Sequence, residues 1–205
     1  MNILALDSAL NKSYLALEFN NEIKSEIIES DQNYHSLYLI EKIKNFMKDK
    51  SFNELDFLAV NIGPGSFTGI RVALTIAKVI SGEINLPIVG LNTSEILLEA
   101  YDCDLLVMDA RRDMYYVGDR KNITLIKKEE IQNHIIQNKI VCDKRSMDIK
   151  ENSICFEDEK NSVDIGKVIL KLAKDKWQKT QDKSQFNPAL IQANYIQTPP
   201  IFGKI

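Results

Sequence analysis

The sequence predicts an α/β protein in which helices pack on sheets, built from two duplicated halves. Three observations support this fold class. The chain opens with a meander of three strand-like segments, helical and strand-like segments then alternate, and a segment from the start recurs near the middle of the chain.

The first ninety residues account for most of the predicted fold. Short strands are expected at residues 2–7, 13–19 and 22–28, separated by polar turns. A helix is expected over Tyr34–Lys48, because apolar side chains recur there at the spacing of one helical face. The rest of this half is predicted as a buried strand at residues 56–62, a helix from Ser66 to about Gly82 and a strand at residues 86–91.

A weak internal repeat indicates duplication. Residues 3–18 can be laid without gaps on residues 105–120. In both copies an apolar run ends in an aspartate and a second strand opens with a tyrosine: Asp7 and Tyr14 in the first copy, Asp109 and Tyr116 in the second. Chance pairing of two β-hairpins is the alternative explanation.

The second half has fewer clear signals. A helix is expected at Lys128–Asn138, short strands at residues 139–143 and 153–157, and a helix at Val163–Gln178. A last strand from Ile191 leads into a proline-containing tail. A boundary near Tyr101 then divides the chain into domains of residues 1–101 and 102–205.

Composition excludes several classes of protein. The 26 basic and 29 acidic residues give a net charge of -3, which argues against a nucleic-acid binder acting on its own. The first residues do not form a signal peptide, and no run approaches the ~20 apolar residues of a membrane helix. The three cysteines lack any CxxC pair, which argues against a disulfide framework or a zinc site. We therefore expect a cytoplasmic protein.

The segment "NIGPGSFTGIRVALTIAKVI" contains the first candidate site. Gly63, Gly65 and Ser66 lie between a strand and a helix start, where backbone N–H groups favour an anion. The spacing fits neither a Walker A loop nor G-x-G-x-x-G, so a tight turn with Ser66 or Thr68 as helix cap is the alternative to a bound nucleotide.

Two further residues could contact a phosphate. Asp7 ends an apolar strand, where it could hold a metal-bound phosphate or cap its own turn. Arg111 could bind a phosphate or form a solvated salt bridge. The only histidines, His35 and His134, form no metal-binding or peptidase motif, so no metal site is expected.

The helix after the glycine turn is unusually apolar. Its polar residues fill a stripe roughly 80° wide, which leaves roughly 240° of apolar side chains between Ile70 and Ile80. A helix on a sheet needs an apolar stripe of only about 100°, so other helices of this chain or a partner protein must cover the remainder.

Three segments together resemble a known family. "NILALDSA", "NIGPGSFTGIRVALTIAKVI" and "VMDARRDMYYV" are similar, in order and spacing, to the TsaB (YeaZ) family, the non-catalytic partners of the tRNA threonylcarbamoyl-transfer enzyme TsaD. The resemblance implies an actin, sugar-kinase and Hsp70-like (ASKHA) fold with a reduced second half. It also implies a cytoplasmic complex, assisted by the ATPase TsaE, that places threonylcarbamoyl on N6 of adenosine 37 in tRNAs reading codons that begin with A.

The resemblance also implies a role for two helices. The helix from about His35 and the helix from about Ser66 would pack against TsaD, or against a second copy when the chain is alone. The contacting residues would be Leu37, Tyr38, Glu41, Ile70, Arg71, Leu74, Ala77 and Lys78. The chain itself would need no cofactor, although ATP or ADP could bind at the interface of the complex.

Tyr195 matches the C-terminal motif of the family, whereas Gln197 stands where arginine is expected. The rival interpretation is a small ATPase or kinase of the same superfold that uses Asp7 and the glycine turn.

Overall fold

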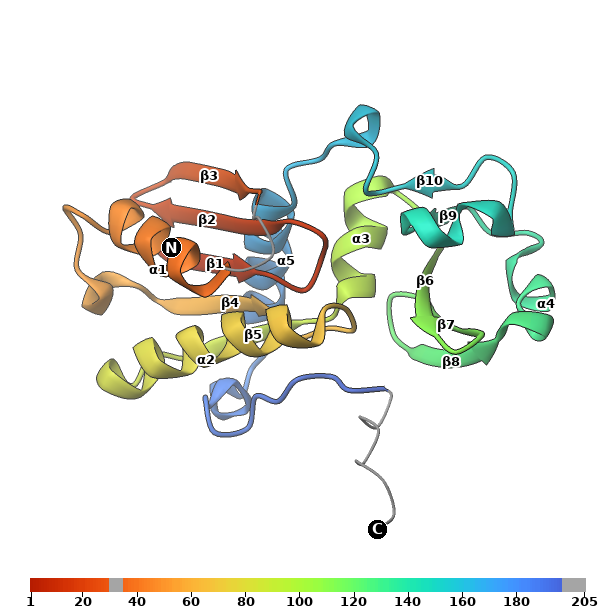
Figure 1. The fold of residues 1–205 in the computed structure, drawn as a ribbon. Helices are drawn as coiled ribbons and strands as arrows, with labels where there is room; N and C mark the ends of the chain where they lie inside the picture. The colour runs from red at the N-terminus through yellow and green to blue at the C-terminus, as the bar shows by residue number, and fades with distance from the viewer. Residues whose placement is uncertain (30–34, 197–205) are drawn as a thin grey trace, which may run out of the picture. The chain divides into compact units, whose positions relative to one another are not determined.

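The computed structural model describes residues 1–29 and 35–196, with the backbone alone for residues 35–37. Over this range the chain forms two compact units. The first comprises the described residues within 1–96 and 164–193, and the second comprises those within 97–163 and 194–196. Each unit holds one five-stranded sheet (Figure 1).

The first unit follows the predicted order of elements. Its strands are β1 (Ile3–Asp7), β2 (Ser13–Phe19), β3 (Glu22–Ile28), β4 (Phe57–Asn61) and β5 (Ile88–Leu91). Its helices are α1 (His35–Phe46), α2 (Phe67–Ile84) and α5 (Ile165–Lys179), and α3 (Thr93–Tyr101) follows β5. The expected strands and helices of this sheet, and the expected helix near residue 165, are confirmed.

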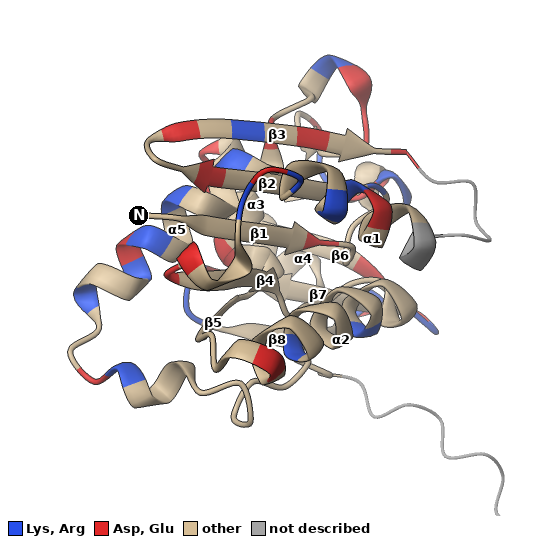
Figure 2. Ribbon diagram, turned by 90° about the vertical axis from the view of Figure 1, so that its left-hand side faces the viewer, with Lys and Arg blue, Asp and Glu red and all other residues tan. Residues whose placement is uncertain are grey.

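The first sheet is covered on both faces. Its strands lie in the order β3-β2-β1-β4-β5, with β1 antiparallel to β2 and parallel to β4. The helices α1 and α2 pack on one face, and α5 packs on the other (Figure 1). Because both faces are covered, β1, β2 and β4 are buried along their whole length, as their nearly continuous apolar sequences require. Charged residues instead gather on the edge strand β3 (Figure 2).

The second sheet repeats this topology with shorter strands. It contains β6 (Leu105–Arg111), β7 (Met114–Gly118), β8 (Ile123–Lys127), β9 (Ile140–Cys142) and β10 (Ile154–Cys155). Read from β8, the strand order is β8-β7-β6-β9-β10, with antiparallel and parallel pairs at the same places as in the first sheet. The duplicated ASKHA-like α/β fold, with its reduced second half, is therefore confirmed.

The structure corrects the internal alignment of the repeat by one residue. Asp7 pairs with Tyr14 across the first hairpin, and Asp109 pairs with Tyr115 across the second. Tyr115 is buried as Tyr14 is, whereas Tyr116 is half-buried. The counterpart of Tyr14 is thus Tyr115, because the second hairpin has a tighter turn with a bulge between Asp109 and Arg111.

Two predicted elements of the second half are wrong. The expected helix over Lys128–Asn138 is a 3₁₀ turn at Lys128–Glu130 followed by the four-residue α4 (Gln132–Ile135). Only Ile131 and Ile135 of this stretch are buried, and no side chain caps either helical piece, so little stabilises a longer helix. The expected strand from Ile191 is absent from the described residues up to 196.

The expected domain boundary also needs correction. A division into residues 1–101 and 102–205 assigns α5 to the second domain, whereas residues 164–193 belong to the first unit. The buried face of α5 packs on the first sheet, where a Cβ on Gly166 would lie 2.9 Å from the Cβ of Ala16. Lys174 of α5 also forms an ion pair with Glu18 of β2.

Candidate functional site

The carboxyl ends of β1, β4 and β5 meet in a buried polar network around Asp7. The side chain of Asp7 is fully buried. Its Oδ1 accepts from the backbone N–H of Ala9 at 2.6 Å, and its Oδ2 accepts from Asn61 Nδ2 at 3.2 Å. Asn61 Oδ1 in turn lies 2.9 Å from the N–H of Gly63 and 3.0 Å from Thr93 Oγ1. Both carboxylate oxygens of Asp7 are therefore engaged in holding three loops together.

The glycine turn lies against the loop that follows β1. A Cβ on Gly65 would lie 2.2 Å from the carbonyl oxygen of Ala9, and one on Gly69 would lie 1.6 Å from that of Ser8. Neither position has room for a side chain. Gly63 has a φ of 102°, which favours glycine. The glycines thus permit close contact with carbonyl oxygens of the chain, which are acceptors and repel a phosphate.

The start of α2 uses its own chain for capping. Ser66 is the N-cap, and its Oγ accepts from the N–H of Gly69 at 3.2 Å, which confirms the capping interpretation of this serine. The N–H of Ser66 donates to the carbonyl of Ala9 at 2.7 Å. Two N–H groups at this helix start are thus already satisfied within the chain.

Burial governs the charge state of Asp7. Removal from water raises its pKa to about 6, and the bonds from Ala9 and Asn61 oppose this rise. The free energy of unfolding should consequently depend on pH near this value. A carboxylate that is buried and fully engaged is poorly placed to bind a metal ion.

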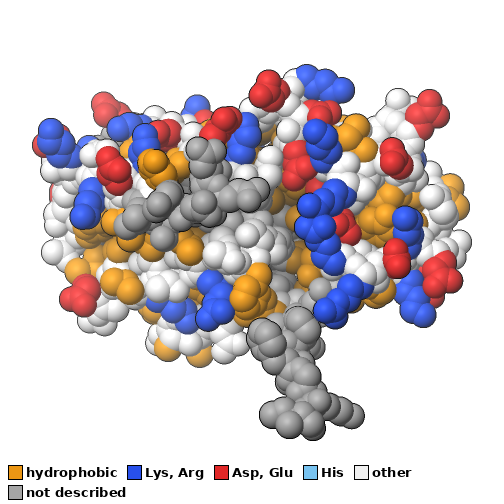
Figure 3. All heavy atoms as spheres, in the orientation of Figure 1, with side chains coloured by type: hydrophobic (Ala, Val, Ile, Leu, Met, Phe, Trp, Pro, Cys, Tyr) orange, Lys and Arg blue, Asp and Glu red, His pale blue; other side chains and the backbone are white. Residues whose placement is uncertain are grey.

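A groove lies between α1 and α2 on the outer side of the first unit. It encloses about 410 Å³ and is mostly apolar. We call it the α1–α2 groove, and its lining residues are Ile40, Phe67, Thr68, Arg71, Val72, Thr75 and Ile76. Phe67 is 45% exposed and Ile40 is 39% exposed. In Figure 3, hydrophobic side chains gather over α1 and α2.

The apolar surface continues along α2 beyond the groove. Val79 follows Val72 and Ile76 at helical spacing and is 61% exposed. Charged residues are sparse along α2 (Figure 2). Within the apolar arc expected between Ile70 and Ile80, Val79 is thus exposed in the first unit.

Three predicted partner contacts lie on the opposite flank of α2 and need correction. Ile70, Leu74 and Ala77 are buried beneath the helix, and the last two belong to the core cluster formed with the first sheet. They are closed to a partner for that reason. Arg71 and Lys78 lie on the outer side, exposed and half-buried respectively.

On α1 the predicted contacts have mixed outcomes. Tyr38 is 47% exposed and Glu41 is exposed, so both are accessible in the first unit. The side chain of Leu37 lies outside the described residues, as does Gln197 near the chain end. The remaining groove residues outside the prediction are Ile40, Phe67, Thr68, Val72, Thr75 and Ile76.

Arg111 lies in the second unit, in the tight turn that joins β6 to β7. Arg111, Arg112 and Asp113 all have positive φ values, of 67°, 53° and 56°. The Arg111 guanidinium lies 3.6 Å from Asp109 Oδ2, and Arg145 lies 3.5 Å from the same oxygen. The salt bridge proposed as the alternative to a phosphate contact is therefore present.

Comparison with known proteins places the chain in a family. The matching family model is described as "TsaD: tRNA N6-adenosine threonylcarbamoyltransferase" and covers residues 22–187. Two curated relatives from Buchnera aphidicola are named "tRNA threonylcarbamoyladenosine biosynthesis protein TsaB". The one from subspecies Baizongia pistaciae is 38% identical over 47% of this chain and 45% of its own length. The one from subspecies Acyrthosiphon pisum is 23% identical over 82% of this chain and 79% of its own length.

The chain belongs to the TsaB (YeaZ) family and shares the TsaD-type domain. A solved structure, YeaZ from Pseudomonas aeruginosa, superposes with a TM-score of 0.72 at 17% identity, covering 86% of this chain and 92% of that protein. At this identity the likeness to YeaZ concerns the fold alone. The ASKHA-like fold and the TsaB resemblance expected from the sequence are thus confirmed.

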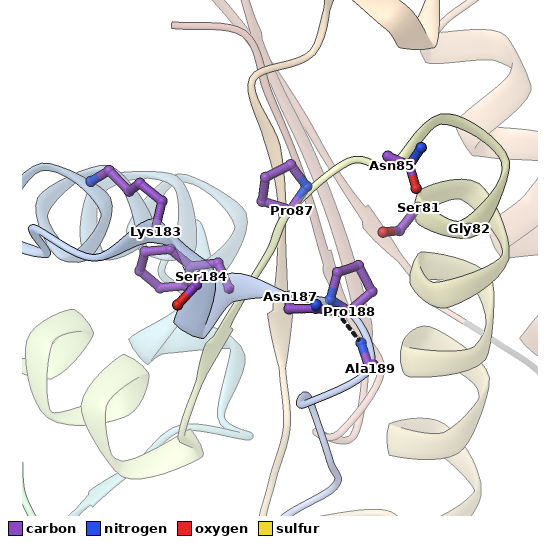
Figure 4. A pocket seen from close by; sticks show the side chains of 10 residues that line it. Ser81, Gly82, Asn85, Pro87, Lys183, Ser184, Asn187, Pro188 and Ala189 are labelled. Atoms are coloured by element: carbon purple, nitrogen blue, oxygen red, sulfur yellow. Dashed lines mark hydrogen bonds between the residues drawn. The ribbon is translucent and has the colours of Figure 1, made fainter.

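A second cavity of this TsaB-family chain lies in the first unit, beside the end of α2. It encloses about 430 Å³ between the turn at Asn85 and the segment of residues 183–189 (Figure 4). Lys183 Nζ donates to the carbonyl of Thr180 at 2.6 Å and lies 4.5 Å from the ring centre of Trp177. These contacts anchor the segment to α5, so this part of the cavity wall is held by the end of α5.

The described residues show few other chemical groupings. Residues 1–29 and 35–196 contain no cluster of three His, Cys, Asp or Glu side chains suited to a metal ion. No helix within the same ranges is both long and apolar enough to cross a membrane. The cysteines are free and buried, and burial raises the pKa of Cys142 to about 12.

Proposed function

We propose that this chain is a non-catalytic subunit of the cytoplasmic machinery that makes threonylcarbamoyladenosine in tRNA. Its role is to bind and support a TsaD-like enzyme, which carries out the transfer to N6 of adenosine 37. A TsaE-like ATPase and tRNA take part through the complex. The names of the TsaB relatives and the TsaD-type domain support this assignment.

One structural observation supports the role in binding. The α1–α2 groove and Val79 form an apolar surface on two adjacent helices, and the sheet beneath is already filled by the opposite flank of α2. Exposed apolar surface of this kind marks a protein interface. Helices that pack across such a surface would form a four-helix contact with the TsaD-like protein, or with a second copy when the chain is alone.

The rival function, a small ATPase or kinase, has less support. The space above Gly65 and Gly69 is filled by carbonyl oxygens, and Asp7 is buried with both oxygens engaged. Calorimetry with Mg-ATP tests this directly. Micromolar binding with turnover by the isolated chain would favour the enzyme over the subunit.

A charge in the apolar surface tests the proposed interface. Val79→Glu places a carboxylate at an exposed position, so the chain should fold while its affinity for the TsaD-like protein of the same cell falls at least about tenfold. Ile136→Glu is the matched control, because Ile136 is an exposed isoleucine of the second unit. Equal affinities of wild type and Val79→Glu, measured by calorimetry, would contradict the assignment of this surface.

A further inference from the structure

Among the described residues that line the α1–α2 groove, only Arg71 is charged. It lies one helical turn after Phe67, and its guanidinium carbon is 5.1 Å from the centre of the Phe67 ring. Both side chains therefore share one wall of the groove. The guanidinium is held against an apolar surface, although it remains exposed to solvent.

Within the described part of the chain, the charge of Arg71 is not balanced by a neighbouring carboxylate. Among residues 1–29 and 35–196, no carboxylate lies within ion-pair distance of Arg71, whereas Lys42 on α1 is paired with Glu26. A partner that covers the groove removes water from the guanidinium. Burying an unpaired charge is strongly unfavourable, so a partner with a purely apolar surface would bind poorly.

We propose that Arg71 determines which partner the α1–α2 groove accepts. The occupant is an amphipathic helix of another protein, which places an apolar side chain in the groove and a Glu or Asp carboxylate on the Arg71 guanidinium. This inference rests on the proposed function and specifies the partner chemistry of the same surface. In such a contact, a groove binds apolar side chains that recur at helical spacing on the partner helix. A guanidinium can bind a carboxylate with two parallel hydrogen bonds.

The charges of the surface favour a different protein over a second copy of this chain. The described outer positions of α1 and α2 carry Lys44, Arg71 and Lys78 against Glu41 and Glu83, with Lys42 already paired. A two-fold contact places this surface against itself, so an excess of positive charge would face its like. A partner with an acidic helix meets the same surface with complementary charge.

Binding to the TsaD-like protein tests the proposal with three variants of the full chain. Arg71→Glu should weaken the affinity about thirtyfold, because it sets two carboxylates against each other. Arg71→Lys should weaken it about fivefold, since an ammonium cannot form the paired hydrogen bonds. Lys121→Glu, an exposed cation in the second unit, is the control and should bind as wild type. Circular dichroism establishes that each variant is folded.

Charge reversal on the partner completes the test. One Glu or Asp of the partner's docking helix, changed to Arg, should restore the binding of Arg71→Glu. The proposal is overturned if Arg71→Glu binds as wild type, or if no such reversal restores its binding. It is also overturned if Arg71→Glu blocks self-association alone and Glu41→Arg restores it, since the occupant is then a second copy. If Val79→Glu loses binding while Arg71→Glu binds as wild type, the role of Arg71 is wrong but the proposed function stands. If both variants bind as wild type, the proposed function is contradicted as well.

Discussion

Gly69 shows how a single residue joins α2 to the loop after β1. The missing side chain lets the helix approach the Ser8 carbonyl, and the buried Asp7 fixes the same loop from the other side. Both residues therefore act on the position of α2, and through it on the α1–α2 groove. Their contributions can be measured separately, because one is steric and the other depends on pH.

A methyl group at Gly69 should strongly destabilise the first unit. Gly69→Ala puts a Cβ 1.6 Å from the Ser8 carbonyl oxygen, so the helix start must move, at a cost of about 3 kcal/mol or more in the free energy of unfolding. Gly82→Ala is the matched control in the same helix. A Cβ there meets nothing within 4 Å, so the change should stabilise the chain by about 0.5–1 kcal/mol. Urea denaturation measures both, and similar effects of the two changes would contradict the close-contact explanation.

Asp7 should make the free energy of unfolding depend on pH. Its pKa is about 6 in the folded chain against an ordinary 3.8, so the folded state holds a proton more tightly than the unfolded state. The contribution of Asp7 to the free energy of unfolding is fully present below pH 4 and is lost as the pH rises through 6. The two limits differ by about 3 kcal/mol. Asp7→Asn cannot titrate, so the stability difference between wild type and this variant should change between pH 4 and 7. Parallel stability profiles over this range would rule out the raised pKa.

The sequence identifies some of these residues and misplaces others. The pattern around Gly63–Ser66 predicts a turn and a helix cap, and both are present because these signals are local. The helical wheel of α2 shows an apolar arc wider than one sheet can cover. It cannot show which flank faces the sheet, since Ile70 and Val72 are equally apolar. The buried flank of Ile70, Leu74 and Ala77 is therefore known only from the tertiary structure.

At the scale of elements, α5 is attached to the first sheet by an aromatic stack at its end. Trp177 lies between Phe57 of β4 and Phe186, with ring centres 4.7 Å and 5.2 Å apart. Lys183 lies over the same indole. One side chain thus joins the sheet, the helix and the segment that lines the cavity of Figure 4.

Removal of this indole should loosen the end of α5. Trp177→Ala should lower the free energy of unfolding by about 3 kcal/mol, because two rings lose their contact at a half-buried site. Trp177→Phe keeps a ring between Phe57 and Phe186 and should cost about 1 kcal/mol. Denaturation followed by circular dichroism measures the difference. Equal losses would show that the ring stack does not stabilise this element.

Prediction of elements succeeded where periodicity was strong and long. The helices α1, α2 and α5 each present several apolar residues at helical spacing, and each was found within two residues of its expected bounds. The stretch at Lys128–Asn138 contains isoleucines, but polar residues surround them and only two become buried. Its expected helix is consequently reduced to α4, because tertiary packing supplies most helical stability.

At the scale of the whole molecule, the chain leaves its first unit and returns to it. Residues 97–163 form the second unit, and α5 then covers the open face of the first sheet. The sequence could not predict this return, since the apolar face of α5 fits either sheet by composition. Asp164 at its N-cap accepts from Ser25 of β3, a contact between residues far apart in the sequence.

The first unit should fold on its own only if residues 164–193 are included with residues 1–96. A chain of residues 1–101 leaves one face of the first sheet uncovered, because it lacks α5, and should unfold or aggregate. Residues 1–96 joined by a flexible linker to residues 164–193 retain α1, α2, α5 and the α1–α2 groove. This shortened protein should unfold in one cooperative transition and should bind the TsaD-like protein, because the proposed interface lies wholly within it. Cooperative folding of residues 1–101 alone, measured by urea denaturation, would show that α5 is dispensable to the first unit.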